Sequence, residues 1–152
     1  MDINSQYMKK ALCLAQKAFL KDEVPVGAVI VKGNKIIGEG YNTKEDNENP
    51  LCHAEIIAIN NACENIGSWR LDGCTMYVTL EPCPMCAGAL INSRIDSVIY
   101  GAYDEKGGCF GSVSDFTDLP FNHRPNLIGG YMQQECNELL ESFFKMKRQH
   151  IL

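Results

Sequence analysis

The spacing of apolar positions along this chain divides it into segments with the period of a helix and segments with the period of a strand. Four segments are predicted to be helices, at 6–20, 53–65, 84–93 and 132–148. Five shorter segments, rich in β-branched residues or alternating between apolar and polar positions, are predicted to be strands, at 24–31, 35–40, 75–80, 97–101 and 127–130. The polar stretch 41–51 and the glycine-rich stretch 103–112 are predicted to be loops, whereas 114–125 follows neither period.

Turn and cap residues mark several of the predicted element ends. Ser5 is a candidate cap for the first helix, and Gly33-Asn34 between two predicted strands is a hairpin signal. Pro84 has the residue type that is favoured in the first turn of a helix. Strands that alternate with helices favour a layered α/β fold, and the early hairpin followed by helix-linked strands predicts a mixed sheet with helices on both faces.

Length and composition fit a globular protein with one domain over 1–152. The chain has 152 residues, of which 45% are apolar and 22% charged, so a core of ordinary size can form. It has no apolar run approaching the ~20 residues of a membrane span, and its N-terminal sequence does not have the pattern of a signal peptide. The net charge of −5 gives no support to a nucleic-acid partner, although a local basic patch can still meet phosphates.

The chain contains eight cysteines, an even number that would also suit four disulfides in a secreted protein. Without a secretory pattern, we expect a cytoplasmic protein in which paired cysteines serve metal or redox sites. Most of the other cysteines are expected to be free thiols in the core, three of them on apolar helical faces, namely Cys13, Cys63 and Cys136. Cys63 shares the predicted apolar side of its helix with Ile56 and Ile59.

Two short motifs at predicted helix starts combine the residue types of a zinc site. One is His53-Ala54-Glu55 and the other is Pro82-Cys83-Pro84-Met85-Cys86. The first turn of a helix brings Cys83 and Cys86 to one face, and a helix N-terminus favours the thiolate form. With His53 as the third ligand, the set suits zinc and leaves the fourth tetrahedral position open to water.

Glu55 completes the chemistry that these ligands can support. It lies two residues after His53, where a carboxylate can take a proton from a water molecule and deliver it to a leaving group. Attack on an aromatic carbon that bears an amino group would then release ammonia. The combination of H-x-E with P-C-x-x-C is the signature of zinc-dependent nucleobase deaminases, so the motifs indicate hydrolytic deamination.

Two other interpretations of the paired cysteines remain open from the sequence. A structural zinc would need a fourth ligand. The spare candidates for that ligand are Cys52, Cys74, Cys109 and His123. A redox CxxC motif would leave His53 and Glu55 without a role.

Nearly the whole chain, from about residue 7 to residue 149, resembles the bacterial tRNA-specific adenosine deaminases of the cytidine deaminase superfamily. Beyond the zinc motifs, the resemblance rests on 23–29, 38–42, 77–83, 85–89, 93–95, 101–102, 111–112, 122–124 and 143–148. It implies a three-layer α/β/α cytidine deaminase-like fold with a five-stranded mixed sheet. It also implies conversion of adenosine to inosine at the wobble position of a tRNA anticodon, by a homodimer whose two subunits both contact the RNA.

The resemblance also implies roles for individual residues. The implied zinc ligands, one ion per subunit, are His53, Cys83 and Cys86, and Glu55 is the implied proton shuttle. The implied base pocket comprises Val26, Asn42, Ala54 and Asp104. By residue type alone, Asn42 also fits a turn asparagine and Asp104 a solvated loop carboxylate.

The end of the last predicted helix carries the candidate RNA contacts. Phe143 and Phe144 are adjacent, so only one of them faces the core, and the other can stack on a base or pack at an interface. A basic cluster follows, formed by Lys145, Lys147, Arg148 and His150. Its cations either complement the helix dipole at a solvated end or contact phosphates, and we assign Phe144, Lys147 and Arg148 to substrate binding.

Two departures from the family pattern and two rival functions accompany this interpretation. Cys52 stands where a small residue is expected, and Cys109-Phe110 lies in the substrate-side loop.

The zinc motif also permits a deaminase of free guanine, cytosine or a nucleoside, against which the segment around Asn42 and the basic tail argue. A non-catalytic, zinc-stabilised RNA-binding subunit is the second rival, and the intact Glu55 argues against it. The small-residue run Ala87-Gly88-Ala89 suits either a close helix contact in a dimer or the core.

Overall fold

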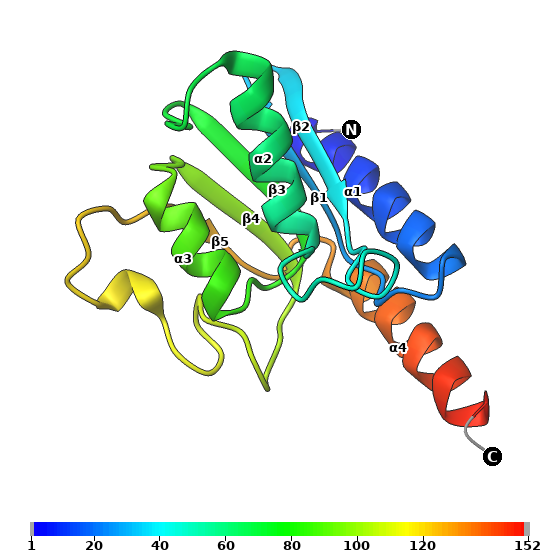
Figure 1. Cartoon of the computed structure of the whole chain (residues 1–152). Coiled ribbons are helices and arrows are strands. Elements are labelled where there is room, and N and C mark those ends of the chain that lie inside the picture. The colour runs from blue at the N-terminus through cyan, green and yellow to red at the C-terminus, as the bar shows by residue number, and fades with distance from the viewer. Residues whose placement is uncertain (1, 151–152) are drawn as a thin grey trace.

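A computed structural model describes residues 2–150 as helices and strands that alternate along the chain (Figure 1). The helices are α1 (Ile3–Leu20), α2 (Ala54–Ile66), α3 (Pro84–Asn92) and α4 (Gln133–His150). The strands are β1 (Gly27–Lys32), β2 (Lys35–Tyr41), β3 (Cys74–Leu80), β4 (Ser97–Ala102) and β5 (Asn126–Ile128). A short 3₁₀ helix, Phe116–Asp118, lies in the segment that follows neither sequence period. Each predicted helix and strand is therefore present, although the last strand ends at Ile128 and not at the predicted residue 130.

The strands form one mixed sheet of five strands in the order β2-β1-β3-β4-β5. β1 runs antiparallel to both β2 and β3, whereas β3, β4 and β5 are parallel. The hairpin between β1 and β2 turns at Gly33 and Asn34, whose φ angles of 55° and 62° suit a type I′ turn. Figure 1 shows α2 and α3 on one face of the sheet and α1 and α4 on the other, which confirms the predicted three-layer arrangement.

Two apolar layers hold the sheet between its helices. One layer joins α1 and α4 to the sheet through residues such as Met8, Val29 and Cys136. The other joins α2 and α3 to the opposite face through residues such as Ala58 and Leu90. Because helices cover both faces, all of β1 except its last residue is buried. None of the helices formed by residues 2–150 combines the length and the apolar character that a membrane span requires.

The backbones of α2 and β2 approach each other directly. A Cβ atom added to Gly38 would lie 2.4 Å from the carbonyl oxygen of Ala58 and 2.8 Å from the Cβ atom of Ala62. A Cβ atom added to Gly40 would lie 2.4 Å from the carbonyl oxygen of Ala54. The strand glycines therefore leave the space in which the helix backbone sits.

This close contact corrects the predicted apolar side of α2. The helix turns an alanine stripe to the sheet, formed by the buried Ala54, Ala58 and Ala62. Ile56, Ile59 and Cys63 are only half-buried. A branched side chain does not fit above the strand glycines, so the larger residues pack at the flanks of the helix instead.

Two predictions about α1 are wrong. Asp2 caps this helix, because its carboxylate accepts a hydrogen bond from the backbone N–H of Ser5 at 2.8 Å. Ser5 therefore lies in the first turn and is not the cap. Cys13 is exposed, because two residues along a helix turn a side chain to the side opposite the buried Ala11 and Ala15.

The predicted start of the first strand is also corrected. β1 begins at Gly27 and not at residue 24. Pro25 has no N–H to donate to a neighbouring strand, and the N–H of Val26 donates to the carbonyl oxygen of Val24 at 2.9 Å in a tight turn. This turn leads Val24 and Val26 away from the sheet and to the edge where the site lies.

Gly38→Ala is expected to destabilise the fold, because the new Cβ atom would collide with the backbone of α2. We expect the free energy of unfolding to fall by about 2 kcal/mol, measured by urea denaturation. Gly88→Ala is the matched control, since a Cβ atom at this helical position meets no described atom within 4 Å. A Gly38→Ala variant as stable as the wild type would contradict the backbone contact between α2 and β2.

Candidate metal centre and its pocket

The predicted site residues come from chain segments that meet at one edge of the sheet. β2, β3 and β4 end at this edge, and β1 begins there. His53 directly precedes α2 and Cys83 directly precedes α3, so both helices point their N-termini at the same place. Asn42 follows β2, and Asp104 lies just beyond β4. The topology thus gathers residues that are far apart in the sequence.

His53, Cys83 and Cys86 form a tight cluster of metal-binding atoms. Nδ1 of His53 lies 3.6 Å from Sγ of Cys83 and 3.6 Å from Sγ of Cys86, and the three atoms lie within 4.8 Å of one another. In a tetrahedral zinc site, bonds of ~2.3 Å to sulfur and ~2.0 Å to nitrogen place those two ligand atoms about 3.5 Å apart. The spacing in the cluster therefore fits a tetrahedral metal ion.

The surroundings of the cluster favour a thiolate. A hydrogen bond from Cys86 lowers the pKa of Cys83 to about 4, and His53 acts in the same direction. The same hydrogen bond, together with burial, raises the pKa of Cys86. Cys83 also stands at the N-terminus of α3, where the helix dipole favours a negative charge. The surroundings of Cys83 therefore favour the deprotonated form, which is the form that binds a metal ion.

Glu55 lies in the first turn of α2 with its side chain buried. Burial raises its pKa to about 7, and the negative charge of Cys83 acts in the same direction. Glu55 lines the same cavity as His53 and Cys83. A carboxyl group in this position is suited to proton transfer at a bound metal ion.

The cluster opens onto a cavity of about 190 Å³. His53, Cys83 and Glu55 are among its lining residues, and Cys86 is buried behind them. All four residues that the sequence analysis assigns to a base pocket also line it, namely Val26, Asn42, Ala54 and Asp104. The structure therefore brings together the predicted ligands, the predicted proton shuttle and the predicted pocket residues.

Asn42 and Asp104 also stabilise the loops on which they stand. The Asn42 amide donates to the carbonyl oxygen of Val24 at 3.3 Å and accepts from the N–H of Lys44 at 3.2 Å. One carboxylate oxygen of Asp104 accepts from the N–H groups of Lys106 and Gly107, each at 3.1 Å. The turn interpretation of Asn42 is therefore realised and coexists with its position at the cavity. Asp104 is half-buried and binds its own loop, so it is not simply a solvated carboxylate.

Sequence analysis missed two buried carboxylates at this edge. Glu81 lines this cavity, Glu23 lines a second cavity next to it, and each is 1% exposed. Both residues lie in segments on which the family resemblance rests, 23–29 and 77–83, but those segments do not mark either glutamate as buried. Residue type alone does not separate a buried glutamate from a surface one, because the difference lies in hydrogen-bond donors that come from distant loops.

The predicted RNA contacts at the end of α4 lie outside the cavity. Phe143 is buried and Phe144 is 45% exposed, so only one of the pair faces the core, as predicted. Lys147 forms an ion pair with Asp22 at 2.6 Å and lies over the ring of Phe143. Arg148 is exposed. None of these side chains lines the cavity at the metal cluster.

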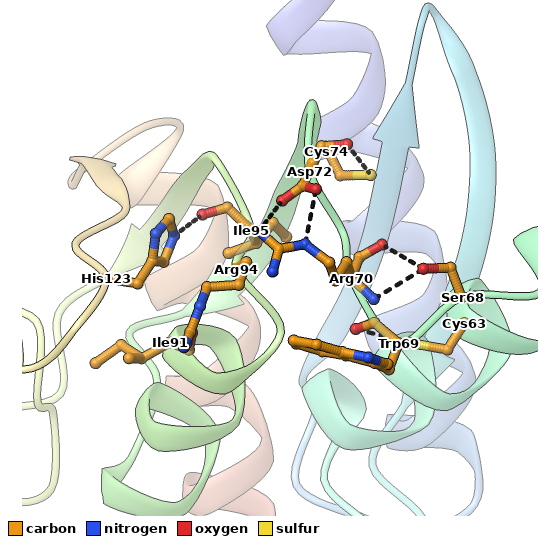
Figure 2. A network of polar contacts seen from close by, with 10 residues as sticks. All are labelled: Cys63, Ser68, Trp69, Arg70, Asp72, Cys74, Ile91, Arg94, Ile95 and His123. Carbon is orange, nitrogen blue, oxygen red and sulfur yellow. Dashed lines mark hydrogen bonds and ion pairs between the residues drawn. The ribbon is translucent and has the colours of Figure 1, made fainter.

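Figure 2 shows the opposite end of α2 and α3, where two spare ligand candidates lie. Nε2 of His123 is 2.6 Å from the carbonyl oxygen of Ile95, and the Cys74 thiol donates to the carbonyl oxygen of Asp72 at 3.6 Å. Both residues are engaged with backbone groups well away from the metal cluster.

The other two candidates do not complete the cluster either. The Cys52 sulfur accepts from Nδ2 of Asn47 at 3.6 Å, and the Cys109 thiol donates to the carbonyl oxygen of Gly107 at 3.7 Å. Within residues 2–150, no fourth His, Cys, Asp or Glu joins the group. A structural zinc site with four protein ligands is therefore not formed by this part of the chain.

Comparison with known proteins places the site in a family context. A family model described as MafB19-like deaminase matches residues 3–148. The tRNA-specific adenosine deaminase of Bacillus subtilis (strain 168) is 46% identical over 143 residues, covering 93% of this chain and 89% of that protein. A solved structure from a study of A-to-I editing by tRNA:A34 deaminases at the wobble position of transfer RNA has a TM-score of 0.85 at 40% identity, covering 90% of this chain and 99% of that chain. A guanine deaminase from Bacillus subtilis has a TM-score of 0.62 at 40% identity, covering 65% of this chain and 64% of that chain.

Removal of one sulfur is expected to abolish metal binding. After extensive dialysis, we expect about one transition-metal ion per chain in the wild type and less than roughly a tenth of that in Cys86→Ala, because two ligands bind such an ion weakly. Metal content per chain is measured by mass spectrometry of the acid-digested protein. Cys109→Ala is the matched control, since it removes another buried thiol outside the cluster. Equal metal content in the two variants would contradict the site.

Proposed function

This chain belongs to the tRNA-specific adenosine deaminases, and on that basis we propose that it converts adenosine to inosine at the wobble position of a tRNA anticodon. The observation that carries the proposal is the cluster of His53, Cys83 and Cys86 beside the buried carboxyl group of Glu55, at the wall of a cavity. In this reaction water replaces the amino group of the base, and ammonia leaves.

Zinc is the ion that we propose for the cluster. One imidazole and two thiolates form a soft donor set, which favours zinc over the hard cations magnesium and calcium. Three protein ligands leave one tetrahedral position for a water molecule. Zinc bound there would supply a nucleophilic water at neutral pH.

Glu55 is the proposed proton shuttle. Its carboxylate takes a proton from the attacking water and delivers it to the amino nitrogen of the base, which then leaves as ammonia. Two observations support this role. The carboxyl group lines the same cavity as His53 and Cys83, and its side chain is buried, so that the proton it carries is shielded from exchange with bulk water.

The walls of the cavity suit a flipped base. Val26 and Ala54 offer apolar surface on which a ring can lie, and Asn42 offers an amide that can hydrogen-bond the edge of the base. Asp104 stands on the loop beyond β4 at the same cavity. We propose these four residues as the base pocket.

A second cavity, of about 580 Å³, continues from the first toward α4. The two share Val24, Asn42 and Lys44 as lining residues, and Lys147 stands at the far end of the second. We propose that nucleotides next to the wobble base lie along this groove with a phosphate at Lys147. Phe144 and Arg148, both exposed on α4, are the proposed contacts for RNA beyond the groove.

The oligomeric state and the compartment are also proposals. We propose a homodimer that acts in the cytoplasm, where tRNA is available. The dimer is supported by α3, where Gly88 and Ala89 are only half-buried and a Cβ atom at Gly88 would meet nothing within 4 Å. Such a small-residue surface allows another helix to approach closely.

Deamination of a free base is the second candidate function. It is favoured by the similarity to a guanine deaminase and by the net charge of −5. The groove that leads away from the cavity argues against it, because a free base fills only the cavity itself. The non-catalytic alternative has little support, since Glu55 is present and buried beside the cluster.

The reaction is tested on an RNA anticodon stem-loop that carries adenosine at the wobble position. We expect the zinc-loaded protein to form inosine on this substrate and to release no ammonia from free guanine, cytosine or adenosine. We expect Glu55→Ala to keep its zinc and to lose activity by a factor of about 10³, the usual contribution of a general acid–base group. Inosine is scored by digestion and chromatography, and zinc by metal analysis.

Each result of this experiment separates two hypotheses. Ammonia from a free base with no inosine on the stem-loop would favour the second candidate. Turnover by Glu55→Ala at the wild-type rate would refute the proton-shuttle role. Bound zinc without turnover of any substrate would favour the non-catalytic alternative.

Lys147→Ala is expected to raise KM for the stem-loop by a factor of about three. It should also lower the slope of log affinity against log salt concentration by the amount that corresponds to about one phosphate contact. Lys147 is the one cationic residue of α4 that lines the groove. A phosphate can replace Asp22 as the partner of its ammonium group. The measurement is stem-loop affinity as a function of salt concentration. Lys35→Ala is the control, because Lys35 opens β2 at the end remote from the site. Identical salt slopes for both variants would contradict the phosphate contact.

A further inference from the structure

Two buried carboxylates that the proposed reaction does not use lie at the two sides of the site, Glu81 in the lining of the cavity and Glu23 in the lining of the adjoining groove. Glu23 and Glu81 are each 1% exposed, and neither belongs to the metal cluster. Glu23 follows α1, whereas Glu81 follows β3 directly, so they come from different parts of the fold. What they share is the kind of partner, because each binds backbone N–H groups of a loop that borders the cavity.

Glu81 gathers the loop that follows β4. Its Oε1 atom accepts from the N–H of Asp104 at 3.1 Å, and its Oε2 atom accepts from the N–H groups of Phe110 at 3.0 Å and Ser112 at 3.1 Å. The hydroxyl group of Ser112 also donates to Oε1. One carboxylate therefore ties the beginning of the loop to its end.

Gly108 shows how closely this loop lies on the carboxylate. A Cβ atom at Gly108 would be 2.3 Å from Cδ of Glu81 and 2.5 Å from each carboxylate oxygen. No side chain fits in that space. The loop is thus wrapped around the carboxylate.

Glu23 does the same for the loop that follows β2. Its Oε1 atom accepts from the N–H of Glu45 at 3.0 Å, and its Oε2 atom accepts from the N–H of Asp46 at 2.7 Å. Lys44 and Asn42, which line the cavity, precede these two residues on the same loop. The loop is therefore held from behind, by a group that stands on the α1–β1 connection.

We propose that Glu23 and Glu81 are positioning residues, each of which sets one side of the base pocket by holding the loop that carries its lining residues. Glu23 acts on the side of Asn42, and Glu81 acts on the side of Asp104. This assignment rests on the proposed function for its kinetic consequences, whereas the contacts themselves do not depend on it.

The role needs a group that only accepts hydrogen bonds. Every partner of Glu23 and Glu81 named above is a donor, so both carboxylate oxygens are used as acceptors. Glutamine keeps the size of the side chain but turns one oxygen into an NH₂ donor that faces an N–H group. Glu81→Gln and Glu23→Gln therefore each leave loop N–H groups without a partner and release one side of the pocket.

Amide hydrogen exchange on the zinc-loaded full chain tests the contacts without reference to activity. In Glu81→Gln, we expect exchange at least about tenfold faster at Asp104, Phe110 and Ser112, with no change at Glu45 and Asp46. In Glu23→Gln, we expect faster exchange at Glu45 and Asp46 and no change at Asp104, Phe110 and Ser112. Unchanged exchange in the loop that each glutamate holds would overturn the proposal.

A crossed set of double variants then tests the positioning of the pocket. We expect Asp104→Ala to raise KM for the stem-loop by about tenfold in the wild type and by less than about twofold in Glu81→Gln, because the loop is already displaced. In Glu23→Gln, the effect of Asp104→Ala should stay about tenfold. Asn42→Ala should show the opposite pattern. Its effect on KM should be much smaller in Glu23→Gln than in the wild type, and it should be unchanged in Glu81→Gln.

The two experiments keep the proposal separate from the proposed function. A wild-type protein that does not act on the stem-loop refutes the proposed function, and hydrogen exchange still decides whether the two carboxylates hold the loops. Additive effects in all four double variants would overturn the positioning role. A general loss of stability would likewise give no preference for the pairs Glu81 with Asp104 and Glu23 with Asn42. If Glu81→Gln does not fold, Ser112→Ala removes one donor to the same carboxylate, and we expect the same exchange pattern at smaller amplitude.

Discussion

The geometry of the whole site depends on how closely α2 lies against β2. Gly38 and Gly40 carry no side chains, so the backbone of the helix contacts the strand directly. His53 stands at the start of that helix and Asn42 at the end of that strand, so the same contact sets the distance between a metal ligand and a pocket residue. Metal–ligand distances are expected within about 0.2 Å of their usual values, so a larger residue at this contact, which would push the helix away from the strand, would also disturb the metal cluster.

The same edge of the sheet uses buried carboxylates in two physically different ways. Glu23 and Glu81 are surrounded by N–H donors that come from two loops, so their charge is stabilised and the loops are ordered. Glu55 is buried beside the metal cluster, and burial raises its pKa to about 7. A well-solvated carboxylate would be a weaker proton acceptor, so burial suits Glu55 to the proton transfer proposed for it, whereas Glu23 and Glu81 stabilise the loops around the cavity.

Local patterns were sufficient to predict the elements of the fold and the metal cluster. Every strand and helix has a periodic signal, the Gly33-Asn34 turn has the required residue types, and the ligands lie in two compact motifs. The errors arise where a distant contact decides. The alanine stripe of α2 depends on glycines in β2, and the start of β1 depends on a tight turn around Pro25. Donors supplied by distant loops likewise determine that Glu23 and Glu81 are buried, and no periodicity in their own segments records this.

The charge of the groove bears on how an acidic chain can bind RNA. Three lysines and four acidic residues line it, so the groove as a whole exerts little net attraction on a polyanion. Lys147 is paired with Asp22, and a phosphate that takes this lysine leaves behind a carboxylate that is already 65% exposed and easily solvated. That exchange of partners therefore changes the free energy of binding by less than about 1 kcal/mol. In the proposed complex, a base that enters the cavity therefore supplies much of the affinity, which favours RNA with an unpaired, displaceable base over RNA in general.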